Sequence, residues 1–127
     1  MKNNVCKPTI LIDTKKSLIR IHKQTLYMLG SPAYVELLVN PEKLYVAVRT
    51  SETKTNFSHK INWSKLCGKN SCEIFSKILI ARLINICETL QFVGSYKIIG
   101  NYSFDENIAC FDLKKAFEIS GEYYEKI

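Results

Sequence analysis

Six basic side chains are the residues of this sequence best suited to a chemical task, the binding of phosphate groups. They are Lys15, Lys16, Arg20, Lys23, Arg49 and Lys60. Lysine and arginine neutralise phosphates and release counterions, which gives affinity for nucleic acid of any sequence. Both arginines interrupt apolar strand patterns, so we expect them to form a pair on an exposed sheet face. Neutralisation by Glu36 or Glu42 would weaken this interpretation.

The charge of the chain is unevenly distributed. The formal net charge is +6, and residues 1–70 hold 12 Lys and Arg against 4 Asp and Glu. Residues 71–127 hold 6 Lys and Arg against 8 Asp and Glu. A basic half attracts polyanions. A composition rich in Lys, Ile and Asn is also typical of a protein encoded by an AT-rich genome, so charge alone leaves the function open.

Patterns for catalysis are missing from the sequence. His22 and His59 are the only histidines, and no nucleophile elbow, metal-binding helix or phosphate loop accompanies them. We interpret His59 as a packed strand residue, and the adjacent Asp105 and Glu106 as solvated turn residues. The sequence therefore predicts a protein that is not an enzyme and that needs no cofactor.

The cysteines and the hydropathy indicate a reducing, aqueous compartment. There are five cysteines, and an odd number without a secretion signal predicts free thiols and a cytoplasmic location. Cys67, Cys72 and His59 could form a zinc site, but a second pair of ligands is missing. We therefore interpret the thiols as buried or incidental and expect no metal. No apolar run is long enough to span a membrane.

The first half of the chain shows clear strand, helix and turn signals. With 127 residues, we expect a single domain over 1–127. Residues 7–13 and 17–22 have strand patterns, and residues 23–30 read as a short helix that Gly30 ends. Strands over 33–39 and 44–50 flank a turn at 40–43, in which Asn and Pro take their preferred positions. The sequence therefore predicts a hairpin over 33–50.

The second half is expected to contain a strand, a long helix and a second hairpin. Residues 57–63 have a strand pattern. Asn70 and Glu73 resemble a capping box for a helix over 71–92, which carries an apolar stripe at helical spacing. Gly94 then ends the helix. Strands over 95–103 and 108–119 flank a turn at 104–107.

Both halves follow the same order of strand, helix and hairpin, over residues 9–50 and 57–119. This order predicts an α+β fold, with an antiparallel sheet of hairpins and one short and one long helix. If the repeat is real, we expect one curved sheet with the long helix on one face. The other face would then be open as a binding platform.

Residues 9–50 resemble the AbrB/SpoVT-type swapped-hairpin DNA-binding domains. Asp13 starts the first turn, Ile21 ends the second strand, Leu29 and Gly30 end the helix, and a hairpin follows. The family's proline after the strand is His22 here, and the arginine inside its helix is absent. The segment also resembles small proteins of Gram-positive bacteria and their mobile elements that share "LG…P.YV.LLVNPE" and have no assigned activity.

The resemblance to the swapped-hairpin domains implies a DNA-binding face and an intertwined homodimer. By position, it implies that Lys15, Lys16, Arg20 and Lys23 face the DNA. Together with the charge, it predicts a small cytoplasmic nucleic-acid-binding or transcription-regulatory protein that forms a homodimer. The alternative is a protein–protein interaction module without nucleic acid, in which unpaired sheet edges accept a partner strand.

Overall fold

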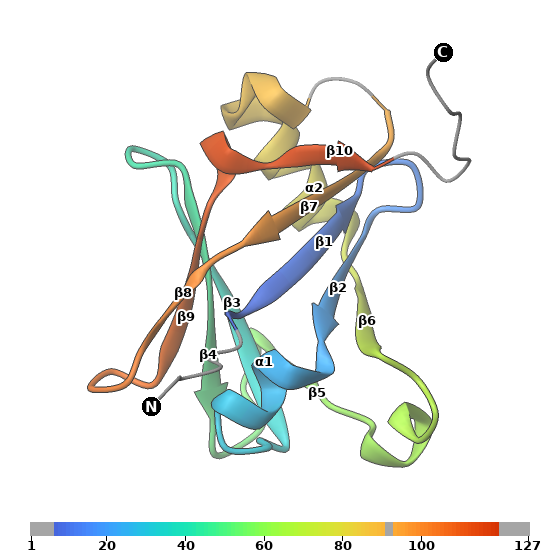
Figure 1. The fold of residues 1–127 in the computed structure, drawn as a ribbon, viewed down its shortest axis with the longest axis vertical. Helices are drawn as coiled ribbons and strands as arrows, with labels where there is room; N and C mark the ends of the chain where they lie inside the picture. The colour runs from blue at the N-terminus through green and yellow to red at the C-terminus, as the bar shows by residue number, and fades with distance from the viewer. Residues whose placement is uncertain (1–6, 91–92, 120–127) are drawn as a thin grey trace, which may run out of the picture.

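The computed structural model describes residues 7–90 and 93–119, and within them it confirms an α+β fold (Figure 1). Ten strands form two five-stranded antiparallel sheets. The first sheet has the order β10-β7-β1-β2-β6, with bounds Phe117–Ile119, Ser95–Ile99, Thr9–Asp13, Leu18–His22 and Ser71–Phe75. The second has the order β5-β3-β4-β9-β8, with bounds Ser58–Lys60, Tyr34–Asn40, Tyr45–Ser51, Ile108–Asp112 and Asn101–Ser103.

The core lies between the two sheets and follows the period-two pattern of the strands. In β1 and β2 of the first sheet, alternate isoleucines such as Ile10 and Ile21 are fully buried. In the second sheet, Val46, Val48 and Phe111 face them and belong to the same apolar cluster. Since side chains of a strand alternate between its two faces, the polar residues of these strands are placed on the outer faces.

Three hairpins share one kind of four-residue turn, at 14–17, 41–44 and 104–107. The last turn residue has a positive φ in each case: 56° at Ser17, 60° at Leu44 and 52° at Asn107. The Oδ1 atoms of Asp13 and Asn40 accept backbone N–H groups two and three residues later. Because these side chains form the hydrogen bonds of the turn locally, the turns can be predicted from the sequence. The predicted hairpin over 33–50 is confirmed as β3 and β4.

The two α-helices lie at opposite ends of the molecule (Figure 1). The predicted short helix is confirmed as α1, Lys23–Met28, and Gly30 follows it with a φ of +90°. Thr25 of α1 is buried, and its Oγ1 accepts the N–H of Thr9 at 2.8 Å. This bond fixes the helix against the start of β1.

The predicted helix over 71–92 is wrong at its beginning. Residues 71–75 form strand β6, which pairs with β2, and the helix α2 spans only Lys77–Ile86. Cys72 and Ile74 are buried whereas Glu73 and Phe75 are exposed, so the pattern here has period two. Ser76, not Asn70, caps the helix, and its Oγ accepts the N–H of Leu79. A 3₁₀ turn at Glu88–Leu90 follows, and residues 91–92 lie outside the described part.

The predicted strand over 57–63 is reduced to the short β5. Phe57 precedes β5 with 78% of its surface exposed, and Trp63 begins a 3₁₀ turn. The indole Nε1 of Trp63 donates to the carbonyl of Pro32 at 2.8 Å, and its ring stacks on Tyr27 of α1. These contacts hold the 61–70 connection against the end of the sandwich.

The last hairpin changes sheets at Gly100. The expected strand over 95–103 is divided into β7 in the first sheet and β8 in the second, with Gly100 between them. A Cβ at this position would overlap the carbonyl oxygen of Cys110 and lie 2.6 Å from the Phe111 ring. The expected strand over 108–119 is likewise divided into β9, a 3₁₀ turn at Leu113–Lys115, and β10. Strands that pass from one sheet to the other produce two packed sheets, not the single curved sheet expected from the repeat.

The helix α2 lies at the end of the sandwich and packs Ile80 and Leu83 into its core. The sequence predicts that the strand over 57–63 precedes the long helix. In the structure, the strand that directly precedes α2 is β6. A pseudo-repeat of 9–50 and 57–119, and a single domain over 1–127, stay predictions.

Candidate functional site

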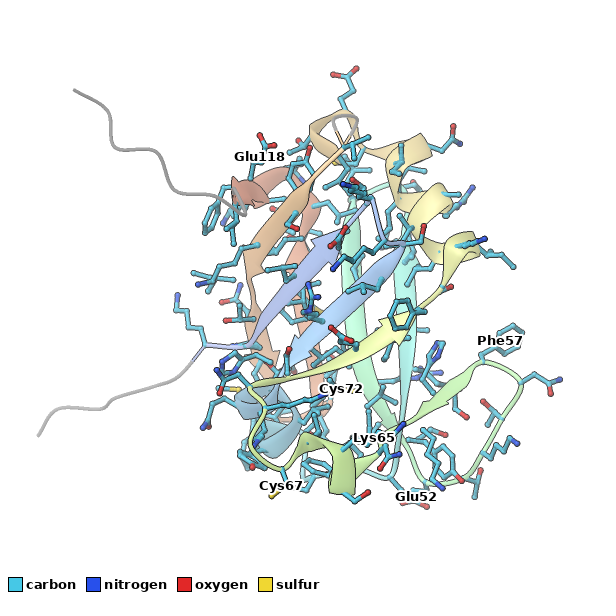
Figure 2. The ribbon with its side chains drawn as sticks, turned by 90° about the vertical axis from the view of Figure 1, so that its right-hand side faces the viewer. Glu52, Phe57, Lys65, Cys67, Cys72 and Glu118 are labelled. Atoms are coloured by element: carbon cyan, nitrogen blue, oxygen red, sulfur yellow. The ribbon has the colours of Figure 1, made fainter. Side chains whose placement is uncertain are left out.

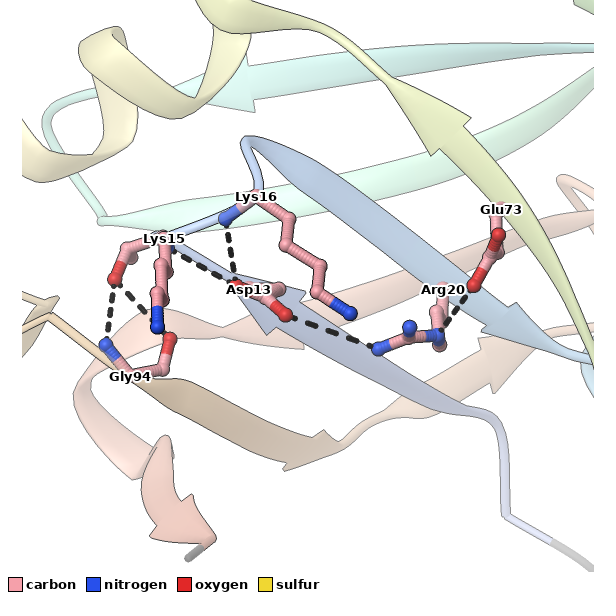
Figure 3. A network of polar contacts seen from close by, with 7 residues as sticks. Asp13, Lys15, Lys16, Arg20, Glu73 and Gly94 are labelled. Atoms are coloured by element: carbon pink, nitrogen blue, oxygen red, sulfur yellow. Dashed lines mark hydrogen bonds and ion pairs between the residues drawn. The ribbon is translucent and has the colours of Figure 1, made fainter. Parts of the chain in front are cut away.

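The two arginines lie on different sheets and each has an acidic partner. Arg20 of β2 donates from Nε to Glu73 Oε2 at 2.9 Å, and its second contact is with Asp13 at 4.0 Å (Figure 3). Arg49 of β4 donates from Nε to Glu36 Oε1, also at 2.9 Å. Arg49 and Thr55 hold the pKa of the Glu36 carboxyl below its usual value. The expected arginine pair on one face is therefore not formed, and both guanidinium groups are neutralised.

Lys15 and Lys16 lie far from Lys23 along the first sheet. Lys15 and Lys16 lie in the β1–β2 turn, where Asp13 accepts their backbone N–H groups (Figure 3). Lys23 begins α1 at the other end of β2. The five residues of β2 separate the turn from the helix by about 17 Å. Asp13, which accepts from this turn, also contacts Arg20, whereas Lys23 lies at the far end of β2 and Arg49 on the other sheet.

Lys60 lies in a different environment, a groove of about 620 Å³ between the open edges of the two sheets. The strand β5 is an edge of the second sheet, and β6 is an edge of the first. The groove is lined from both edges and from the connection between them, which contributes Lys65 and Lys69. Figure 2 looks onto this side, with Cys72 on β6 and with Lys65 and Cys67 on the connection.

The groove is electropositive. Among the residues that the structure describes, Lys60, Lys65 and Lys69 have no carboxylate within ion-pair distance. Among the described residues that line the groove, the one acidic side chain is Glu73, which is paired with Arg20. The segment 53–72 contains four lysines and no Asp or Glu. Unpaired lysines that share one concavity with neutral amides, Asn62 and Asn70, form an attractive site for anions.

Backbone groups along both edges also face the groove. Ser76 donates to Ser17, and Lys23 donates to Asn70, so the even-numbered residues of this segment point their N–H and C=O groups toward β2. Alternation leaves the backbone groups of Ser71, Glu73 and Phe75 on the open side. On β5, Ile61 donates to Ala33, which leaves the backbone groups of Lys60 open in the same way, whereas the N–H of Ser58 donates to the carbonyl of Thr55. The groove thus offers N–H donors beside its ammonium groups.

The imidazole of His59 and the thiol of Cys72 lie in or beside the groove, and both are uncharged. His59 alternates with Lys60 along β5, and partial burial lowers the pKa of its imidazole, so it is neutral near pH 7. Burial raises the pKa of the Cys72 thiol, and Glu73 raises it further, so this cysteine is not a thiolate. Within residues 7–90 and 93–119, no three His, Cys, Asp or Glu side chains are placed to hold a metal ion.

Comparisons with known proteins give no relative. No protein-family model matches the chain, and no curated protein or solved structure matches it. No helix in the described part of the chain has the length and apolar character needed to cross a membrane.

Proposed function

We propose that this protein binds nucleic acid through the groove between β5 and β6, without catalysing a reaction. The observation that carries the proposal is the convergence of Lys60, Lys65 and Lys69 on one concave surface without acidic partners. Of the six basic residues expected from the sequence, Lys60 belongs to this groove. A transcription-regulatory role, a homodimer and a cytoplasmic location stay predictions.

The lysines suit a phosphate backbone because each ammonium group supplies charge and three N–H donors. All three side chains belong to exposed residues, so each can adjust to a phosphate at little cost in buried surface. The side-chain amides of the groove and the open backbone N–H groups can donate hydrogen bonds to the remaining oxygens of the same phosphates. Contacts of this kind give affinity and register but carry no base specificity.

A second candidate function is the binding of an acidic, extended protein segment. The observation that favours it is the row of open backbone groups on β6 and β5, since a partner strand could pair with either edge. Carboxylates of that segment would then meet the same lysines. We favour nucleic acid because three lysines that line one groove match a ligand that carries one phosphate on every nucleotide.

The proposal predicts a defined dependence of binding on salt. A labelled oligothymidine of about ten nucleotides, comparable to known single-strand footprints, should bind at low ionic strength. Three phosphate contacts give a slope of about −2 for the logarithm of the association constant against the logarithm of the salt concentration. Fluorescence anisotropy over a range of NaCl concentrations measures this slope.

The outcome that contradicts the proposal is a lack of binding at low salt, or binding that salt does not weaken. Poly-glutamate, added as a competitor at equal charge, separates the two candidate functions. If poly-glutamate displaces the oligothymidine only at large excess, the result supports nucleic acid as the ligand of the groove. Tight binding of poly-glutamate without binding of oligothymidine supports the acidic segment.

A further inference from the structure

We propose that the groove selects single-stranded over duplex nucleic acid, with one base stacked on Phe75. This inference rests on the proposed function and names its ligand class. Phe75 lines the groove together with the lysines, and 65% of its surface is exposed. It is the last residue of β6, on the same outward row as Ser71 and Glu73.

Phe75 is available as a stacking platform. Two ring pairs are formed among the described aromatic residues, Tyr27 with Trp63 and Tyr102 with Phe104, and Phe75 takes part in neither. Its ring is held on a strand, which Ile19 and Ile74 anchor in the core. A base stacked on this ring would bury apolar surface that is now in water.

The spacing along β6 matches a short length of a single strand. Ser71 follows the lysine-bearing connection directly, and Phe75 lies four residues further, about 13 Å along the strand. Phosphates at the lysine end and a base at Phe75 can therefore belong to the same short stretch of chain. The backbone N–H groups of Ser71, Glu73 and Phe75 lie along this path.

The concavity of the site disfavours a duplex. Its volume of about 620 Å³ is in the range of pockets that hold one drug-sized molecule, roughly 300–1,000 Å³, which is the size of one or two nucleotides. The internal bases of a duplex are stacked on both faces, so none of these is free to stack on Phe75. A single strand offers its bases to aromatic side chains and its phosphates to lysines at the same time.

The test compares an oligothymidine of about ten nucleotides with a duplex of the same length, using wild type and the variants Phe75→Ala, Phe75→Tyr and Phe104→Ala. Phe104 is 85% exposed and lies in the β8–β9 turn, outside the groove, so it is the matched control. We expect Phe75→Ala to weaken single-strand binding about 10-fold and to leave duplex binding unchanged. Phe75→Tyr should bind the single strand as wild type does, because it keeps an aromatic ring, and Phe104→Ala should also behave as wild type.

The inference is overturned if Phe75→Ala binds the single strand as well as wild type does. It is also overturned if the variant weakens single-strand and duplex binding equally. In both cases binding that still depends on the groove lysines would leave the proposed function standing. Absence of oligonucleotide binding by the wild-type protein would overturn both.

Discussion

Replacing Lys60, Lys65 and Lys69 together by alanine is expected to weaken oligothymidine binding about 100-fold at low salt. Each exposed contact between a lysine and a phosphate contributes about 1 kcal/mol, and three such contacts correspond to a factor of 100 or more. The three side chains lie on exposed positions of the groove, so the fold should persist. Fluorescence anisotropy measures the affinity, and circular dichroism verifies that the variant is folded.

The matched control is the triple variant Lys15→Ala, Lys16→Ala and Lys23→Ala. It removes the same charge, from positions that the resemblance to swapped-hairpin domains implied but that lie outside the groove. We expect it to lose less than about 3-fold in affinity, through the weaker overall field of the protein. An equal loss in both triple variants would indicate attraction to net charge only. A larger loss in the control would place the nucleic acid on the β1–β2 turn and α1.

Replacing Gly100 by alanine is expected to have the largest effect on stability. The added Cβ would overlap the Cys110 carbonyl oxygen and the ring of Phe111, which is fully buried. Gly100 cannot shift away from these neighbours without disturbing its own hydrogen bond, in which its N–H donates to the carbonyl of Pro8 at 2.8 Å. Overpacking of this kind costs about 3 kcal/mol. Urea denaturation followed by circular dichroism gives the change in the free energy of unfolding.

Gly68→Ala serves as the control for this prediction. Gly68 has a φ of +80° but no atom lies within 4 Å of the position of its Cβ. Its substitution therefore tests the backbone preference without steric overlap and should cost about 1 kcal/mol. Equal losses at the two positions would show that the close packing at the crossing between sheets does not limit stability.

The sequence predicted those elements that local chemistry determines. Asp13 and Asn40 form their turns through hydrogen bonds to residues two and three positions later, so the information lies within a few residues. The same is true of Gly30, whose positive φ ends α1. Alternating apolar residues predicted the strands that the structure has as β2 and β4, because burial follows the period of the strand.

The elements that the sequence did not predict depend on distant partners. Residues 71–75 are a strand because β2, about fifty residues earlier, offers an edge to pair with. A capping-box pattern at Asn70 and Glu73 suggested a helix instead, and tertiary pairing overrides such local preferences. The change of sheet at Gly100 likewise depends on Cys110 and Phe111, which no local pattern reveals.

The candidate site is likewise only partly predictable from the sequence, because its residues come together through the fold. Charge predicts Lys60, whereas the sequence predicts Phe75 within a helix and does not distinguish Lys65 or Lys69. The sequence does contain a signal for this basic surface, since the segment 53–72 has four lysines and no acidic residue. Both arginines lie within strand patterns of the sequence, yet cross-strand pairing places Glu73 opposite Arg20 and Glu36 opposite Arg49. Such pairs follow from register, which only the fold determines.

The most direct test of the central claim is a map of the binding surface by NMR. Titration of the ¹⁵N-labelled protein with oligothymidine should shift the amide signals of Lys60, of residues 62–70 and of Ser71, Glu73 and Phe75. The amides of the β1–β2 turn and of Arg49 should remain in place. Shifts centred on Arg20 and Arg49, or the absence of shifts at a saturating concentration of the oligonucleotide, would contradict the assignment of the β5–β6 groove as the nucleic-acid site.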